Sequence, residues 1–193
     1  MLIPEGDFRA YLFDCDGTIA DTMPIHYKAW CEALAPWNCE FPVDLFYDWA
    51  GIPGEKITQM LGERSGITLP ESEIVHRKEE AYFQRLDEVR PVAAVLAQIE
   101  KQSGKIPLAV VSGSPRDSVL KTLGVLGLVD RFATIVGAED YVKGKPAPDP
   151  FLLAASRLNI PPQHCLVFED ADLGVQSAQA AGMAWVKVTS QRI

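Results

Sequence analysis

Short apolar runs recur along the chain and predict five β-strands. They occupy residues 10–13, 108–111, 133–136, 166–168 and 184–188. Most are uninterrupted rather than alternating, which is typical of parallel strands buried on both faces. Helical patterns lie between the later runs, at residues 114–127, 149–159 and 173–182. This alternation of strand and helix predicts an α/β core built on a doubly wound parallel sheet.

The region between the first and second apolar runs has a different pattern. It contains no convincing strand but four helix-like segments, at residues 24–35, 42–50, 54–65 and 70–88. Pro24 and Pro91 mark the two borders of this region, because proline interrupts helices and strands. We therefore predict an α/β core domain made of residues 1–22 and 91–193, with a small all-helical domain, residues 23–90, inserted after the first strand.

Composition narrows the class of protein. The 193 residues include 48% hydrophobic and 23% charged positions, and the formal net charge is −8. An acidic chain without a basic patch is a poor partner for nucleic acid or for an anionic membrane surface. The four cysteines show no metal-ligand or disulfide spacing, and the first ten residues lack the pattern of a signal peptide. We expect a monomeric cytoplasmic protein that acts on a small molecule.

Polar clusters follow four of the five predicted strands. They are residues 14–18 after the first strand, 112–114 after the second, 143–150 beyond the third and 169–170 after the fourth. The carboxyl ends of parallel strands lie at one edge of a sheet, which is where such folds bind ligands. The sequence therefore predicts that all four clusters converge on one site.

The first cluster, "DCDGT", allows two interpretations. Asp-Gly is common in turns, and Asp16 or Thr18 could cap the following helix. Alternatively, the carboxylates could hold a cation, and convergence with the other clusters favours this interpretation. Mg²⁺ prefers oxygen ligands. Asp14 and Asp170 would supply carboxylates, Asp16 its main-chain carbonyl, and Glu169 a contact made directly or through water.

The remaining clusters suit a phosphoryl group. Lys145 would neutralise both the phosphate and a nearby carboxylate. Ser112 and the adjacent backbone of Gly113 and Ser114 would donate hydrogen bonds to phosphoryl oxygens.

Two aspartates at this position can divide the work of phosphoryl transfer. Asp14 would attack phosphorus and form an aspartyl-phosphate. Asp16 would protonate the leaving alcohol and then deprotonate the water that breaks the intermediate, which is help typically worth ~10²–10⁴ in rate.

These residues resemble the four motifs of the haloacid dehalogenase superfamily. The matching stretches are "DCDGT", Ser112, "GKPAPDPF" around Lys145, and "FEDADLGVQSAQAAGM". The helical insert resembles the cap domain of the beta-phosphoglucomutase-like branch, and residues 21–30 resemble its hinge and first helix. The resemblance implies a Rossmann-like core under a helical cap.

The resemblance also implies roles for individual residues. Asp14 would be the nucleophile and Asp16 the acid/base, with Ser112 and Lys145 contacting phosphate and Asp170 binding the metal. Dehalogenases and cation-pumping ATPases of this superfamily lack an acid at the position of Asp16, so its presence implies an alcohol leaving group.

Cap residues bear on the choice between mutase and phosphatase. The beta-phosphoglucomutases carry a cap arginine and a lysine after the second-motif serines, whereas Gly54 and Pro115 stand there in this chain. What remains is more similar to the fructose-1-phosphatase-like proteins. The resemblance further implies that Lys78, His26 and Gly51 face the substrate.

Three hypotheses follow. The leading one is a Mg²⁺-dependent phosphatase acting on a small phosphorylated metabolite, foremost a sugar phosphate. The alternative is a phosphomutase of the beta-phosphoglucomutase type. A non-catalytic, metabolite-binding member of the fold would lack the nucleophile or the lysine, but Asp14 and Lys145 are both present.

Overall fold

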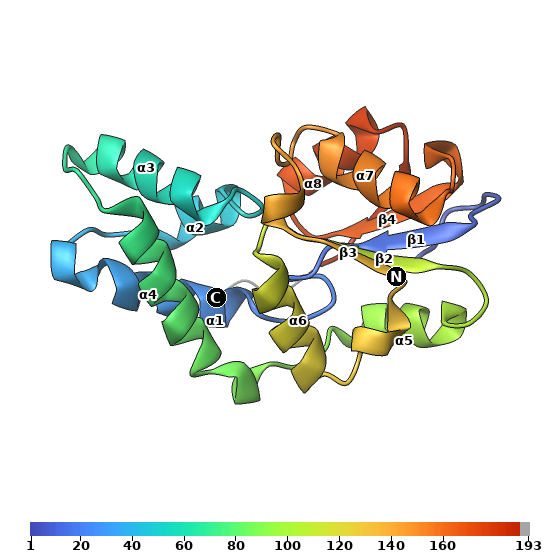
Figure 1. Ribbon diagram of the computed structural model, residues 1–193, viewed down its shortest axis with the longest axis horizontal. Coiled ribbons are helices and arrows are strands. Elements are labelled where there is room, and N and C mark those ends of the chain that lie inside the picture. Colours follow the sequence, from blue (N-terminus) through green and yellow to red (C-terminus); the bar gives the residue numbers. More distant parts are fainter. Residues whose placement is uncertain (190–193) are drawn as a thin grey trace.

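The computed structural model describes residues 1–189, and its centre is a five-stranded parallel sheet (Figure 1). The strand order is β3-β2-β1-β4-β5. The strands are β1 (Ala10–Phe13), β2 (Leu108–Val111), β3 (Thr134–Val136), β4 (Cys165–Glu169) and β5 (Ala184–Lys187). In the centre of the sheet, Tyr11 of β1 stands opposite Leu108 on one side and Leu166 on the other. The predicted parallel α/β core is confirmed.

Eight α-helices and several short 3₁₀ turns connect the strands within the described residues. The helices are α1 (Met23–Leu34), α2 (Val43–Asp48), α3 (Gly54–Ser65), α4 (Glu71–Phe83), α5 (Ala93–Gln102), α6 (Arg116–Val125), α7 (Asp149–Leu158) and α8 (Asp172–Ala180). The 3₁₀ turns are η1 (Ala35–Trp37), η2 (Leu86–Glu88), η3 (Val129–Arg131), η4 (Ala138–Asp140) and η5 (Pro162–His164). The first four α-helices form a group on one side of the molecule, and the other four flank the sheet (Figure 1).

Helices cover both faces of the sheet, which explains the continuous apolar runs. In β1, Tyr11 and Phe13 pack into one core with α5 and α6, whereas Ala10 and Leu12 pack into another with α7 and α8. Successive side chains of a strand point to opposite faces, so a strand covered on both sides is apolar at every position. The edge strand β5 differs, because only Val186 of its four residues is buried.

One predicted helix is shorter in the structure, and one helix of the structure was not predicted. The helix predicted over 70–88 ends at Phe83, after which the chain turns through η2 toward Pro91 and the sheet. This turn brings residues 90–92 back beside residues 19–21, where the chain left the sheet. A helix that continued straight to residue 88 would not do so. The helix α5 was not predicted; it covers the sheet together with α6 through the buried residues Val95 and Ile99.

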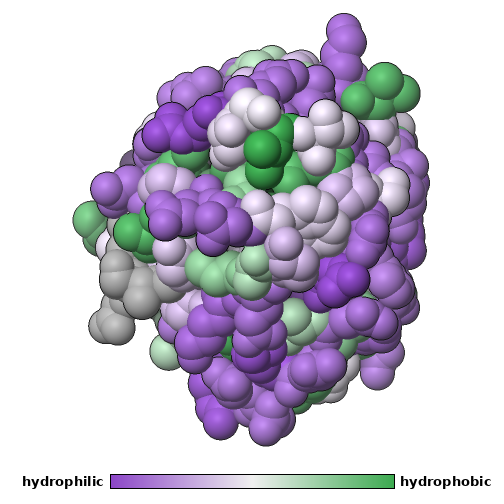
Figure 2. Space-filling view, turned by 90° about the vertical axis from the view of Figure 1, so that its left-hand side faces the viewer, coloured by the Kyte–Doolittle hydropathy of each residue, from purple (hydrophilic) through white to green (hydrophobic). Residues whose placement is uncertain are grey.

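The helices α1–α4 pack around an apolar cluster of their own. Its largest members include Trp30, Leu34, Phe41, Phe46 and Leu61. The outward face of this group is mainly hydrophilic, with few apolar residues showing (Figure 2). Most of the apolar side chains of the insert are therefore turned inward, as an amphipathic helix pattern requires.

The chain enters and leaves this helical group along two adjacent segments. The amide N of Asp21 donates to the carbonyl of Arg90 at 2.8 Å, and the amide N of Val92 donates to the carbonyl of Ile19 at 2.9 Å. These contacts place both crossings side by side. Over residues 1–189, none of the helices is long and apolar enough to cross a membrane.

Candidate active site

Lys145 and two carboxylates form a buried ionic cluster at the carboxyl edge of the sheet. Asp14 follows β1 directly, and Glu169 ends β4 next to it. The Lys145 Nζ donates to Asp14 Oδ1 at 2.7 Å, to Glu169 Oε1, and to the carbonyl of Val111 at 3.2 Å. Burial would lower the pKa of Lys145, but the two carboxylates outweigh this effect and raise it above its usual range. The lysine is therefore a fixed positive charge beside Asp14.

Three carboxylates at this edge could hold a cation. Asp14, Glu169 and Asp170 each offer an oxygen, and these oxygens lie within 4.8 Å of one another. Burial and the neighbouring carboxylates raise the pKa of Asp14 well above its usual value, although Lys145 opposes the shift. Burial and the charge of Glu169 likewise raise the pKa of Asp170 to about 7. One lysine does not balance three carboxylates, so a divalent cation would relieve their repulsion.

Glycines let the backbone approach these carboxylates closely. A Cβ added at Gly17 would lie 2.2 Å from Asp170 Oδ2, and the φ of Gly17 is +87°, which side chains rarely adopt. A Cβ added at Gly174, in α8, would lie 1.8 Å from Glu169 Oε1. The carboxylates are thus held against main chain, and Glu169 Oε2 also accepts the amide N of Ala171 at 2.8 Å.

Substituting Gly174 tests this packing. We expect Gly174→Ala to lower the free energy of unfolding by about 1–3 kcal/mol, because the methyl group overlaps the Glu169 carboxylate. The control is Gly124→Ala in α6, where an added Cβ meets nothing within 4 Å. That change should be neutral or stabilising by up to about 1 kcal/mol, because alanine favours helix. Urea denaturation measures both, and equal stability of the two variants would contradict the close approach at Gly174.

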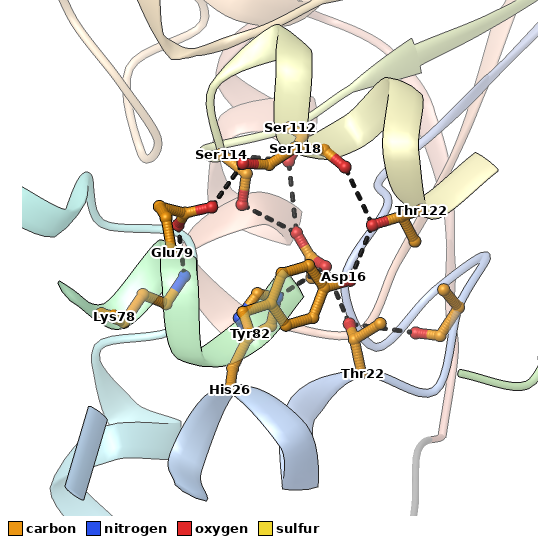
Figure 3. A network of polar contacts seen from close by, with 11 residues as sticks. Asp16, Thr22, His26, Lys78, Glu79, Tyr82, Ser112, Ser114, Ser118 and Thr122 are labelled. Carbon is orange, nitrogen blue, oxygen red and sulfur yellow. Dashed lines mark hydrogen bonds and ion pairs between the residues drawn. The ribbon is translucent and has the colours of Figure 1, made fainter. Parts of the chain in front are cut away.

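Asp16 has polar partners that differ from those of the ionic cluster (Figure 3). Its Oδ1 accepts the hydroxyl of Thr22 at 2.7 Å and contacts His26 Nε2 at 2.9 Å. Its Oδ2 accepts the hydroxyls of Ser114 at 2.9 Å and Ser112 at 3.5 Å. Burial would raise the pKa of Asp16, but His26 and Thr22 outweigh it and hold the pKa below its usual value.

The network around Asp16 continues into a contact between α4 and α6. The His26 ring stacks on Tyr82, with centroids 4.1 Å apart, and the Tyr82 hydroxyl lies 2.6 Å from Thr122 Oγ1. One turn earlier on both helices, Glu79 accepts the hydroxyl of Ser118 (Figure 3). The helix α4 therefore contacts α6 through two pairs of side chains, and the pair that includes Tyr82 also reaches Asp16 through His26.

Lys78 and Glu79 form an ion pair beside this contact. Lys78 Nζ donates to Glu79 Oε1 at 2.7 Å (Figure 3). Burial would raise the pKa of Glu79, but Lys78 and Ser118 outweigh it and lower the pKa below its usual range. Lys78 is therefore already paired with a carboxylate in this arrangement.

The loop after β2 meets the loop before α3. Ser112 is 1% exposed, and its Oγ accepts the amide N of Ser114 at 3.0 Å. A Cβ added at Gly113 would lie 2.8 Å from the carbonyl oxygen of Gly51, so no larger residue fits there without a shift. Gly51, with φ of +90°, also approaches the Lys145 side chain.

A cavity of about 580 Å³ lies between the sheet edge and the helical insert. Every site residue predicted from the sequence lines it except Lys145, which lies behind the wall and contacts Asp14 and Glu169. Gly54 and Pro115 also line the cavity. These are the two positions at which the resemblance to the beta-phosphoglucomutases would place an arginine and a lysine.

The structure bears out one half of the first interpretation of "DCDGT". The chain does turn here, since the amide groups of Thr18 and Ile19 both donate to the carbonyl of Cys15. The predicted cap is wrong, because α1 begins only at Met23 and Thr18 Oγ1 donates instead to Asp170 Oδ1 at 3.2 Å. Even Thr22, at the N-terminal boundary of α1, makes no capping bond with its side chain and donates to Asp16. The side chain of Asp16 is not part of the three-carboxylate group. The contact of its main-chain carbonyl with a metal stays a prediction.

Sequence reasoning missed several residues of the site. They are Thr18, Thr22, Glu79, Tyr82, Ser118 and Thr122. The hydroxyl residues carry no signal of their own in the sequence. Tyr82 does carry one, because it is a large aromatic residue on a predominantly charged helix and one turn after Lys78.

Comparisons with known proteins agree with this geometry. Residues 8–182 match the family model of the haloacid dehalogenase-like hydrolases. The fructose-1-phosphate phosphatase YqaB of Escherichia coli is 38% identical over 182 residues, covering 94% of this chain and 96% of that protein. The beta-phosphoglucomutase of Bacillus subtilis is 31% identical over 191 residues, which cover 93% of this chain and 83% of that protein.

Solved structures show the same fold. The crystal structure of beta-phosphoglucomutase from Clostridium difficile superimposes with a TM-score of 0.83 at 26% identity, over 95% of this chain and 85% of that one. The match to the family model spans the strands β1–β4 and the whole helical insert. The chain belongs to the haloacid dehalogenase-like hydrolase family.

Proposed function

We propose that this protein is a metal-dependent phosphatase that hydrolyses phosphate monoesters of small metabolites, foremost sugar phosphates. The observation that carries the proposal is the placement of two aspartates with different partners, Asp14 beside Lys145 and Asp16 beside His26, in one cavity. The names of two relatives support the substrate class: the Escherichia coli fructose-1-phosphate phosphatase and a Thermotoga maritima phosphorylated carbohydrates phosphatase, which is 29% identical.

The carboxylates of Asp14, Glu169 and Asp170 fit a divalent cation. They are hard oxygen donors that the chain crowds together with only Lys145 to balance them. We propose Mg²⁺, because it is bound through few carboxylates together with substrate phosphate. When bound, the ion would neutralise charge on the phosphoryl oxygens.

The reaction then uses the two aspartates in turn. Asp14 attacks phosphorus, a carboxylate O–P bond forms, and the bond from phosphorus to the alcohol oxygen breaks. Asp16 gives its proton to that oxygen, and afterwards takes a proton from the water that hydrolyses the aspartyl-phosphate. Lys145 holds Asp14 in place, and Ser112 with the backbone of Gly113 and Ser114 donates to the phosphoryl oxygens.

The contacts of Asp16 indicate what this cycle requires. The hydroxyl and imidazole groups around Asp16 favour the carboxylate, which is the form needed for the second step. To donate a proton in the first step, Asp16 must exchange some of these contacts for the leaving oxygen. His26 lies on α1, so a movement of this helix would break its contact with Asp16 and free a carboxylate oxygen for the leaving group.

We also propose that residues 23–90 act as a cap over a core of residues 1–22 and 91–193. The adjacent crossings near Asp21 and Arg90, and the separate apolar cluster of the insert, support this division. A closed cap would exclude bulk water while the aspartyl-phosphate forms. We further propose that the protein acts as a monomer in the cytoplasm, which size-exclusion chromatography and cell fractionation test.

Removing the metal tests the proposed function. We expect hydrolysis of p-nitrophenyl phosphate by the purified protein to be lost in EDTA and restored by Mg²⁺. Mg²⁺ should also raise the melting temperature, because a ligand at 100 times its Kd adds about 2.7 kcal/mol to the stability of the folded state. Asp170→Asn should weaken this stabilisation, whereas Asp172→Asn, two residues away and outside the carboxylate group, should retain it.

Two results would contradict the proposal. Hydrolysis that continues unchanged in EDTA would remove the metal from the mechanism. Isomerisation of a sugar monophosphate in a coupled assay primed with glucose 1,6-bisphosphate, without net release of phosphate, would show a mutase instead.

A further inference from the structure

We propose that the preferred substrate is the monophosphate of an uncharged alcohol with an apolar or aromatic face, and that the cavity rejects compounds with a second anionic group. This inference rests on the phosphatase function proposed above and specifies its substrate class. It rests on two parts of the cavity wall that would not contact the phosphoryl group.

The first part is an apolar wall contributed by the helical insert. It comprises Trp30, Phe46, Trp49, Ile57 and Val75. These side chains lie across the cavity from the carboxylates at the sheet edge, where the phosphoryl group would bind. The alcohol half of the substrate would therefore lie against this wall, which offers ring faces and methyl groups but few hydrogen-bond partners.

The second part is the set of charges on the rest of the wall. Among the described residues no arginine lines the cavity, and Lys78 is already paired with Glu79 at 2.7 Å. The remaining charged residues there are acidic: Glu55, at the start of α3, and Glu139, in η4. A second phosphate or a carboxylate would meet two carboxylates and no unpaired cation, and like charges brought together at a binding site are strongly unfavourable.

Matched substrate pairs test the charge rule. We expect kcat/KM to be at least about 100-fold lower for fructose 1,6-bisphosphate than for fructose 1-phosphate, because the second phosphate gains no cation. The same direction should hold for 6-phosphogluconate against glucitol 6-phosphate, two open-chain compounds that differ only in having a carboxylate or a hydroxymethyl group at C1. Equal rates within either pair would overturn the charge rule.

A second pair tests the apolar wall. Benzyl phosphate and glycerol 3-phosphate both release alcohols of high pKa, so both depend on Asp16 in the same way. We expect kcat/KM for benzyl phosphate to be at least about 10-fold higher, within the range that contacts in a hydrophobic pocket provide. A preference for glycerol 3-phosphate would overturn this part of the proposal.

A charge reversal at the wall, with a matched control, locates the effect. Glu55→Lys places a cation in the cavity, whereas Glu63→Lys makes the same change on the same helix at a residue that does not line it. The ratio of kcat/KM for the bisphosphate to that for the monophosphate should rise about 10-fold or more in the first variant and stay within about twofold in the second. Equal rises in both variants would assign the effect to net charge and contradict the proposal.

Failure of this inference is distinguishable from failure of the proposed function. Mg²⁺-dependent hydrolysis of p-nitrophenyl phosphate with no discrimination within the pairs would overturn only the inference. Absence of hydrolysis of every phosphate ester, in protein whose melting curve shows it to be folded, would overturn both.

Discussion

Asp14→Asn is expected to reduce phosphatase turnover by at least about 10⁴-fold, as substitutions of catalytic nucleophiles do. The amide is close to the carboxylate in shape but is not a nucleophile for phosphorus. Its oxygen can still accept the hydrogen bond that Lys145 Nζ donates at 2.7 Å, so the buried lysine keeps a partner. Phosphate release from a sugar monophosphate measures the effect under saturating Mg²⁺.

Two controls separate chemistry from folding in this experiment. Asp117→Asn makes the same chemical change at an exposed position of α6, where Asp117 pairs with Lys121, and should leave turnover within about twofold of the unmodified protein. Acid-quenched mass spectrometry should detect a phosphoryl adduct on the peptide containing Asp14 in the unmodified protein and none in Asp14→Asn. Full turnover by Asp14→Asn would refute the covalent mechanism.

Asp16→Asn is expected to slow the hydrolysis of alkyl phosphates by about 10²–10⁴-fold, the usual contribution of a general acid–base residue. An asparagine can accept the hydroxyl of Thr22 but cannot donate a proton to an alkoxide or take one from water. The loss should fall on kcat and leave binding of the phosphoryl group largely intact, because Ser112 and the backbone of Gly113 are unchanged.

The identity of the leaving group provides the internal control for Asp16. p-Nitrophenolate leaves without protonation, so Asp16→Asn should still form the aspartyl-phosphate from p-nitrophenyl phosphate. Hydrolysis of that intermediate needs the missing base. Stopped-flow absorbance should therefore show a burst close to one equivalent followed by slow turnover. If Asp16→Asn slowed both classes of ester equally and showed no burst, the proposed division of roles would be wrong.

The strands and the convergence of the site were predictable from the sequence. Continuous apolar runs such as "LAVV" and "LVF" predicted strands covered on both faces, and β2 and β4 are buried in this way. Asp14 and Ser112 directly follow strands, and Glu169 is the last residue of one. This placement was enough to predict that they meet, because parallel pairing puts strand ends at one edge.

Element ends and one helix were less predictable. The periodicity of α4 continues in the sequence past Phe83, but the need to return the chain beside Asp21 ends the helix there. The helix α5 was missed, although its buried Val95 and Ile99 stand one turn apart. In both cases contacts with distant segments, rather than local preference, set the outcome.

The α/β core, the family resemblance and the residues that converge at the sheet edge could all be read from the sequence. Those features depend on local apolar patterns and on the geometry shared by parallel sheets. The partners of Asp16, the contact of Tyr82 with Thr122 and the pairing of Lys78 with Glu79 came only from the three-dimensional arrangement of residues 1–189. The physical reason is that these interactions depend on where folding places side chains: Tyr82 and Thr122 are 40 residues apart in sequence, yet their hydroxyl oxygens lie 2.6 Å apart in the fold.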